Sequence, residues 1–169
     1  MNELKTDAVL RSLNGAILDS AKSQGSEMIN RKLLAKRLHE SYHRDVSLKE
    51  WDCFYCGAPA DTVDHCPPLA MAESVSASRI LYRCCRLCNS SLGGAFLVTA
   101  LERCEHLRAR YSRRWHRDIE MPHWTTEEIE SLDGSLKAEI IKAMKRKERA
   151  INVLSNLQRR IDELWEGTY

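Results

Sequence analysis

The chain has 169 residues, of which 43% are hydrophobic and 30% are charged. These values are typical of a globular domain and exclude a fibrous or intrinsically disordered protein. Charged residues interrupt the N-terminal segment where a signal peptide would be apolar, and no segment approaches the roughly 20 apolar residues of a membrane span. We therefore expect a single cytoplasmic domain over residues 1–169 with no membrane partner. The formal net charge of +2 favours no class of partner, because a nucleic acid responds to how charge is distributed.

Residues 1–50 are predicted to form N-terminal helices. Apolar residues recur at helical spacing within residues 4–21, and Ser26 is positioned to cap a second helix. A capping-box pattern at residues 47–50 is followed almost at once by Cys53, which leaves room for a turn or two of helix at most.

Residues 51–94 differ in character, because they hold most of the seven cysteines. Four of these form two C-x-x-C pairs, Cys53 with Cys56 and Cys85 with Cys88. Each pair can form a tight turn that presents two thiolates to one ion, and four thiolates complete the tetrahedral site that structural zinc prefers. Cys84 could replace Cys85 as the partner of Cys88, but the two-residue spacing makes the better turn. Cys104 is predicted to be buried as a small apolar residue.

A second group of residues lies between the two cysteine pairs. The run from Thr62 to His65 predicts a short strand that delivers the carboxylate of Asp64 and the imidazole of His65 before two prolines end it. Because a closed four-cysteine site leaves no open coordination position, zinc there would hold the fold together and catalysis must come from other residues. An Asp-His dipeptide alone is more often a solvated carboxylate beside a structural histidine, so its context decides its meaning.

The context here is a cysteine knuckle, then Asp64, His65 and proline, then a second knuckle followed directly by Asn89. This order resembles the HNH, or ββα-metal, endonucleases, and most closely their branch similar to recombination endonuclease VII. The resemblance covers about residues 51–94, and the run from Cys88 to Gly93 with an arginine-rich helix behind it looks like small phage and bacterial members of the class. It implies a small ββα-metal core of two strands and a helix.

The resemblance also implies roles for three residues. His65 would be the general base that activates water, while Asp64 and Asn89 would hold one catalytic divalent cation, Mg²⁺ or Mn²⁺. Carboxylate and amide oxygens suit Mg²⁺, and phosphodiester hydrolysis needs a deprotonated water together with positive charge on the reacting phosphate. Two family features are missing: residues 78–82 contain no asparagine to orient His65, and no basic residue follows the second knuckle within 89–94. Another group must orient His65, and Cys66 beside it could be incidental or compete for metal.

Residues 95–121 are predicted to form one basic amphipathic helix. Its apolar residues recur at intervals of three and four, which leaves the arginines on the other faces. Between Arg79 and Asp118, nine arginines stand against three acidic residues, a local excess of +6. Arginine at this density favours contacts with phosphate groups, which supply affinity without base readout. The candidates for these contacts are Arg86, Arg103, Arg110, Arg113, Arg114 and Arg117.

Residues 122–169 are predicted to form C-terminal helices. Thr125 or Thr126 could cap a short acidic helix, and after the break at Asp133-Gly134 an apolar stripe predicts a final helix of roughly thirty residues. That helix could pack on the core, or it could form a homodimer with a second copy of the chain.

These features together predict an α+β fold, helical over most of its length, in which a zinc-held ββα-metal core is flanked by helices. The predicted function is hydrolysis of DNA phosphodiester bonds by a metal-dependent endonuclease. The alternative is a degenerate, non-catalytic module that uses the zinc site and the basic helix to bind nucleic acid or to act as an adaptor. Only the nuclease accounts for Asp64, His65 and Asn89 together.

Overall fold

The computed structural model describes residues 33–34, 36–44, 51–71, 74 and 76–167. The chain divides into two units, Met1–Ser41 and Tyr42–Tyr169. In the first unit residues 33–34 and 36–40 are helical, and the rest of the predicted N-terminal helices lie outside the described residues, as does the capping-box pattern at 47–50. The single domain over residues 1–169 therefore stays a prediction.

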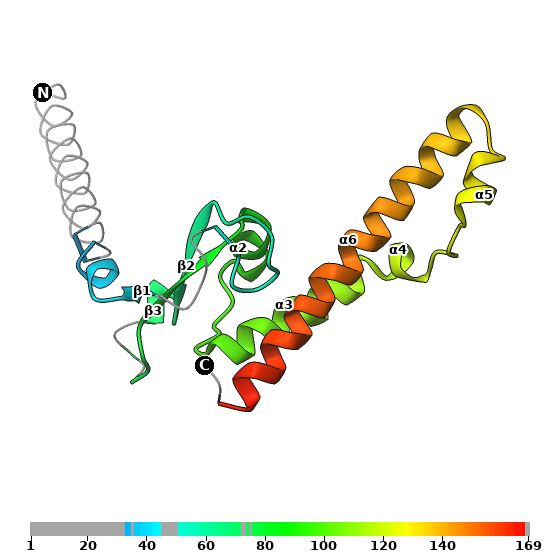
Figure 1. Cartoon of the computed structure of the whole chain (residues 1–169). Coiled ribbons are helices and arrows are strands. Elements are labelled where there is room, and N and C mark those ends of the chain that lie inside the picture. Colours follow the sequence, from blue (N-terminus) through cyan, green and yellow to red (C-terminus); the bar gives the residue numbers. More distant parts are fainter. Residues whose placement is uncertain (1–32, 35, 45–50, 72–73, 75, 168–169) are drawn as a thin grey trace, which may run out of the picture. The chain divides into compact units, whose positions relative to one another are not determined.

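The second unit is an α+β structure that is helical over most of its described length, as the sequence predicts (Figure 1). Its strands are β1 (His43–Arg44), β2 (Thr62–Cys66) and β3 (Ile80–Cys84), with the short 3-10 helix η1 (Leu69–Met71) between β2 and β3. The helices that follow are α2 (Arg86–Leu92), α3 (Ala100–Arg114), α4 (His116–Glu120), α5 (Thr126–Glu130) and α6 (Gly134–Trp165). Within the described ranges, no helix combines the length and the apolar character that a bilayer-spanning segment needs.

The register of the sheet defines two faces. β2 and β3 pair antiparallel, with Asp64 opposite Tyr82 and His65 opposite Leu81, and β1 adds to β3 in parallel. Side chains alternate across a strand, so residues two positions apart share a face. We call one face the inner face, with Thr62, Asp64, Cys66, Tyr82 and Cys84, and the other the outer face, with Val63, His65, Leu81 and Arg83. β3 then passes through Cys85 into α2, so strand, strand and helix follow one another directly.

α3 packs along α6, and the buried residues of this helix pair form one hydrophobic core with those of the cysteine loop, β2, β3 and α2 (Figure 1). Buried residues recur every three or four positions on both helices: Cys104, Leu107 and Tyr111 on α3, and Ala150, Val153, Leu157 and Ile161 on α6. Full burial of one leucine side chain contributes about 2–3 kcal/mol, so this helix pair is a major source of stability.

Two side chains of α6 hold the loop that precedes the sheet. Arg160 donates from Nε to the carbonyl oxygen of Phe54 at 3.1 Å, and its guanidinium lies 4.6 Å from the centre of the Phe54 ring. Asn156 donates from Nδ2 to the carbonyl oxygen of Cys56 at 3.0 Å. Since Phe54 is itself buried, α6 fixes both the backbone and the ring of this loop.

The predicted basic helix over residues 95–121 is wrong in its bounds. A capping box begins α3 later, because Thr99 Oγ1 accepts from the Glu102 backbone nitrogen at 3.2 Å and Glu102 Oε2 accepts from the Thr99 backbone nitrogen at 2.9 Å. Trp115 then separates α3 from α4. The predicted C-terminal elements are confirmed: Thr125 caps the short acidic α5 with a second capping box, and α6 has 32 residues.

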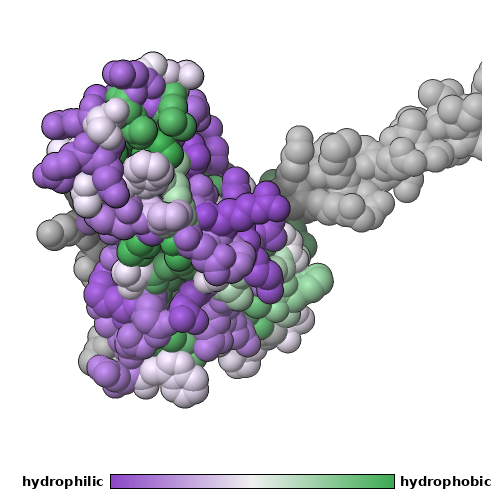
Figure 2. Space-filling view, turned by 90° about the vertical axis from the view of Figure 1, so that its right-hand side faces the viewer, coloured by the Kyte–Doolittle hydropathy of each residue, from purple (hydrophilic) through white to green (hydrophobic). Residues whose placement is uncertain are grey.

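α5 packs against α6 and leaves part of the apolar stripe of α6 uncovered. Figure 2 shows hydrophobic side chains gathered between hydrophilic ones at the end of the molecule that carries α5. A groove lined by Ile129, Ile141, Met144 and Ile151 lies between these two helices, and Ile151 is 43% exposed.

Candidate functional site

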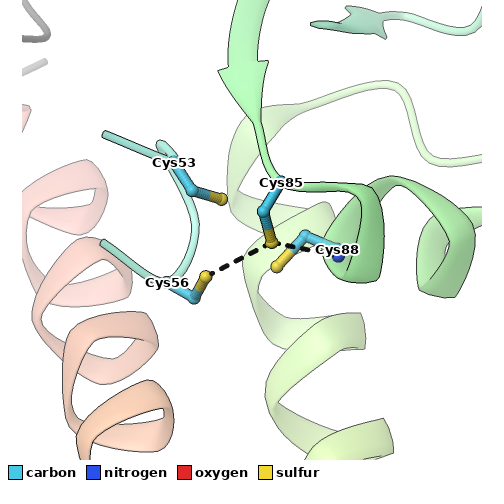
Figure 3. A group of neighbouring side chains, drawn as sticks. All are labelled: Cys53, Cys56, Cys85 and Cys88. Carbon is cyan, nitrogen blue, oxygen red and sulfur yellow. Dashed lines mark hydrogen bonds between the residues drawn. The ribbon is translucent and has the colours of Figure 1, made fainter. Parts of the chain in front are cut away.

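The four cysteines of the two C-x-x-C pairs form one cluster (Figure 3). Their Sγ atoms all lie within 4.8 Å of one another, and the Sγ atoms of Cys56 and Cys85 are 3.6 Å apart. A tetrahedral site with Zn–S distances of about 2.3 Å requires sulfur atoms roughly 3.8 Å apart, so the cluster matches such a site closely. The preference for Cys85 over Cys84 is confirmed, because Cys84 is not a member of the cluster.

The first knuckle is a tight turn. The Gly57 backbone nitrogen donates to the carbonyl oxygen of Cys53 at 2.9 Å, and Cys53 donates to the carbonyl oxygen of Ala58 at 2.7 Å. Gly57 has a φ of +71°, and a Cβ at this position would lie 3.0 Å from Nδ2 of Asn156. Only glycine adopts this conformation without strain and leaves room for the α6 side chain that holds the turn.

The second knuckle is the start of a helix. Cys85 is the N-cap of α2, and its Sγ accepts from the Cys88 backbone nitrogen at 3.5 Å. The hydroxyl of Tyr111 on α3 donates to Sγ of Cys88 at 3.5 Å, which adds a second hydrogen bond to the cluster. The end of β3, α2 and α3 therefore meet at the sulfur atoms.

The protonation of the cluster shows why it suits a cation. The hydrogen bond with Cys56 is the first cause that lowers the pKa of Cys53, and hydrogen bonds with the other three cysteines lower the pKa of Cys85. The hydrogen bond with Cys53 is the first cause that raises the pKa of Cys56 and of Cys88. Four thiolates at this separation repel one another strongly unless a positive ion lies among them. The four cysteines could therefore bind a metal such as zinc, and a closed set of four leaves no coordination position for a substrate.

Asp64 is buried on the inner face and is held by two partners. Its Oδ2 accepts from the hydroxyl of Tyr55 at 2.5 Å and forms an ion pair with Nη1 of Arg103. Tyr55 is fully buried and its pKa is raised well above the usual value, first by burial and then by the charge of Asp64. Neither contact involves Oδ1, which is the carboxylate oxygen left for a further ligand.

Arg103 corrects one prediction. The helical pattern placed it with the arginines on the solvent-facing sides, as a phosphate contact, but it is 2% exposed. Burial alone would lower its pKa, yet Asp64 and Tyr55 raise it, so the guanidinium stays charged beside the carboxylate. Its Nε donates to the carbonyl oxygen of Leu97 at 3.2 Å, so Arg103 is an internal counter-ion and cannot reach a phosphate from this position.

His65 follows Asp64 on β2 but belongs to the outer face. The ring of Tyr42 meets the His65 ring edge-on, with ring centres 5.1 Å apart and an interplanar angle of 84°. Tyr42 is buried, and its hydroxyl donates to the carbonyl oxygen of Pro67 at 2.6 Å. The sequence left open which group orients His65, and the ring of Tyr42 is one group that contacts it.

Asn89 connects α2 to β2. Its Nδ2 donates to Oγ1 of Thr62 at 3.1 Å and to the carbonyl oxygen of Val63 at 3.4 Å. A carbonyl only accepts, so this contact fixes the amide nitrogen toward the strand. In the part of the chain that the structure describes, no hydrogen bond involves Oδ1 of Asn89, which is the atom that would ligate a cation. The fold thus brings Asn89 to the strand of Asp64 and His65, although those two residues lie on opposite faces.

Cys66 is a buried residue of the inner face. Its thiol donates to the carbonyl oxygen of Val98 at 3.3 Å, and burial raises its pKa to about 11. Cys66 is not a member of the four-cysteine cluster, and it lies on the same face of β2 as Asp64. Cys104 is fully buried on α3, as predicted.

The other candidate arginines, Arg86, Arg110, Arg113, Arg114 and Arg117, are exposed. Arg86 forms an ion pair with Asp61 at 3.5 Å. Arg114 lines a hollow of about 220 Å³ with Trp115, Arg146 and Arg149, and Asp118 on its rim pairs with Arg146 at 3.2 Å. Arg149 was not among the predicted residues, because only the packing of α3 on α6 brings it to Arg114, and the sequence carries no sign of that contact.

No family model matches the chain, and neither the curated proteins nor the solved structures include a match.

Proposed function

We propose that this protein is a metal-dependent endonuclease that hydrolyses phosphodiester bonds in DNA, as an HNH enzyme does. One observation carries the proposal: the side-chain amide of Asn89, next to the second cysteine knuckle, is hydrogen-bonded to the strand that holds Asp64 and His65. An acid, an imidazole and an amide 25 positions further along the chain meet at one strand, with a separate cysteine cluster to hold them there. A purely structural cysteine site does not require this convergence.

In this mechanism His65 accepts a proton from a water molecule as that water attacks phosphorus. The water oxygen forms the new bond to phosphorus, the bond to one sugar oxygen breaks, and that oxygen takes a proton from solvent water as it leaves. Asp64 and Asn89 would hold the catalytic cation, Mg²⁺ or Mn²⁺, through Oδ1 of each side chain, while Oδ2 of Asp64 stays with Tyr55 and Arg103. The cation would supply positive charge to the phosphate and to the leaving oxygen. Tyr42 holds the imidazole in place for proton transfer.

We infer that the metal in the cysteine cluster is zinc and that its role is structural. Four thiolates are soft ligands in a tetrahedral set, and zinc is the common ion in such sites. Thiolate ligands stay reduced in the cytoplasm, which is where we expect the protein to act.

We further propose that DNA phosphates contact the exposed arginines of α3 and α4 and the hollow lined by Arg114 and Arg149. Basic side chains on one surface give affinity through counterion release, without reading the bases. The homodimer through α6 is also a proposal: the groove beside Ile151 would be buried in it. A monomeric mass in solution at micromolar concentration would contradict the dimer.

A second candidate is a non-catalytic nucleic-acid-binding or adaptor module. The ion pair between Asp64 and Arg103 favours it, because a buried guanidinium already neutralises the carboxylate that the nuclease needs as a ligand. A cation beside Arg103 would meet like charge, which weakens its binding. The two candidates differ in one property, cleavage that depends on a divalent cation.

Cleavage of supercoiled plasmid with Mg²⁺ or Mn²⁺ tests the proposal. We expect the wild type to cut, and His65→Ala and Asn89→Ala each to lose at least about a hundredfold in rate, the first through loss of the general base and the second through loss of a ligand of the cation. His116→Ala is the matched control, since His116 is an exposed histidine of α4, and it should cut like the wild type. If the wild type binds DNA and cuts neither DNA nor RNA with either cation, the non-catalytic module is correct.

A further inference from the structure

The outer face of the sheet carries a groove that the mechanism above does not use. It has a volume of about 300 Å³, and its lining includes Arg44 of β1, Val63 of β2, and Leu81 and Arg83 of β3, with Trp51 on the preceding loop. The groove is formed by the three strands and by residues that precede β2, so most of its walls belong to the folded sheet.

Trp51 presents a flat aromatic surface to solvent at this groove. Trp51 is 69% exposed, although tryptophan is on average one of the more buried residues. The backbone beneath it is held, since its carbonyl oxygen accepts from the Ala60 backbone nitrogen at 2.6 Å and Asp52 pairs with Pro59. An exposed indole on a fixed backbone is a surface on which another flat ring can stack.

The charge of the groove is positive. Arg44 and Arg83 line it, and the acidic residue among its lining residues, Asp61, is already engaged. Asp61 Oδ1 accepts from the Arg86 backbone nitrogen at 2.7 Å, and its Oδ2 pairs with Nε of Arg86 at 3.5 Å. A ligand that suits this groove would therefore combine a flat ring with negative charge.

The groove adjoins the proposed general base. Val63, which lines it, and His65 lie two positions apart on the same face of β2, about 7 Å along the strand. Leu81, which also lines it, is the cross-strand partner of His65. A chain bound across the groove would run toward His65.

We propose that this groove binds an unpaired nucleobase, stacked on Trp51, with the flanking phosphates on Arg44 and Arg83. The ligand is a single-stranded nucleic acid or an unpaired segment of a duplex, because a paired base has both faces covered by its neighbours and cannot stack on a protein ring. The identification of this strand as the substrate rests on the proposed nuclease function, whereas its binding does not.

Fluorescence anisotropy with a labelled oligothymidylate tests the groove, using the full chain without added divalent cations. Stacking on an aromatic residue is worth ~1–3 kcal/mol per base, so we expect Trp51→Ala to weaken binding roughly 5- to 100-fold and Trp51→Phe to retain most of it. Trp165→Ala is the matched control, because Trp165 on α6 is 70% exposed and lies outside the groove. A duplex of the same length should bind with little dependence on Trp51.

Two outcomes would contradict the proposal that this groove binds a nucleobase. One is equal affinity for the oligothymidylate in Trp51→Ala and Trp165→Ala when the metal content and circular dichroism of both match the wild type. The other is equal loss in Trp51→Ala and Trp51→Phe, since that would mean that ring stacking is not the cause. Arg44→Ala and Arg83→Ala should each reduce the slope of affinity against salt by about one, as loss of one phosphate contact does.

The same variants separate this inference from the nuclease. If binding depends on Trp51 but no plasmid or single strand is cut, the proposed nucleobase-binding site is correct and the proposed nuclease activity is wrong. If His65-dependent cleavage occurs while Trp51→Ala binds and cuts the single strand like the wild type, the proposed nuclease activity is correct and the proposed nucleobase-binding site is wrong.

Discussion

Asp64 and Arg103 stand 39 positions apart in the chain, and their side chains are 9% and 3% exposed. The sequence suggested the carboxylate as a metal ligand and the arginine as a phosphate contact, but the fold pairs them. A sign of the burial was present: Arg103 is three positions after Ala100 and four before Leu107, which are both buried residues of the α3 stripe. Arg103 was nevertheless predicted to be exposed, because an arginine is almost never fully buried unless it is paired.

The ion pair predicts a large effect on stability. Arg103→Met would leave the carboxylate of Asp64 buried beside Tyr55 without a counter-ion, and we expect a loss of about 3–5 kcal/mol in the free energy of unfolding. Urea denaturation measures it. Arg110→Met is the control, since Arg110 is exposed on the same helix, and its change should stay within about 0.5 kcal/mol. Equal effects of the two substitutions would contradict the role of Arg103 as a buried counter-ion.

The cluster of four cysteines was predictable at the residue scale, because C-x-x-C spacing is a local property of the chain. The contacts of Tyr55 and Tyr42 were not, since each depends on a partner at the other end of a strand or loop. The predicted strand already implies that Asp64 and His65 belong to opposite faces, and only the fold shows that the face of Asp64 is the buried one.

Among the elements, α6 and α5 were predictable because their caps and apolar stripes are local and complete. α3 was predicted to begin too early, although the pattern of Thr99 and Glu102 is the same capping box that marks α5 at Thr125 and Glu128. The apolar residue Leu97, which lies before the cap, fits the helical spacing by chance. A capping box is therefore better evidence for a helix start than periodicity alone.

The cap of α3 makes a prediction at the element scale. Thr99→Ala removes the side-chain acceptor for the Glu102 backbone nitrogen, and we expect the free energy of unfolding to fall by about 1 kcal/mol. Thr125→Ala removes the equivalent bond from α5, a five-residue helix with no buried residue, so it should cost clearly less. Both are measured by chemical denaturation. A larger loss in Thr125→Ala would mean that α5, and not α3, supports the core.

For the whole molecule, the cysteine cluster joins separate segments of the chain, in addition to the hydrogen bonds that α6 makes to the cysteine loop. It links the loop at Cys53, the end of β3 and α2, and Tyr111 extends the link to α3. The sequence predicted the cluster but not how much of the core surrounds it, because Phe54 and Tyr55 lie between two ligands and are both buried. The burial of Phe54 and Tyr55 depends on contacts with segments far away in the sequence, which only the complete fold provides.

Removal of the metal should therefore loosen the entire second unit. We expect Cys88→Ser to lose bound zinc and to unfold at a markedly lower temperature than the wild type, because metal binding contributes directly to folding. Cys104→Ser is the control, since Cys104 is equally buried but lies outside the cluster, and it should keep its zinc. Metal analysis and thermal unfolding give the two readings. The zinc site would be contradicted if Cys88→Ser kept its zinc and unfolded at the same temperature as Cys104→Ser.

The hold of α6 on the first knuckle also has a consequence for the order of events during synthesis. The hydrogen bonds of Asn156 and Arg160 reach back 100 and 106 positions to the carbonyl groups of Cys56 and Phe54. During synthesis, the cysteine loop therefore leaves the ribosome before the α6 residues that hold it have been made. Its thiols lack the cover of α6 at that stage. A nascent chain in this state is exposed to oxidation and to mispairing of its thiols, so the vulnerable period of this protein is its translation.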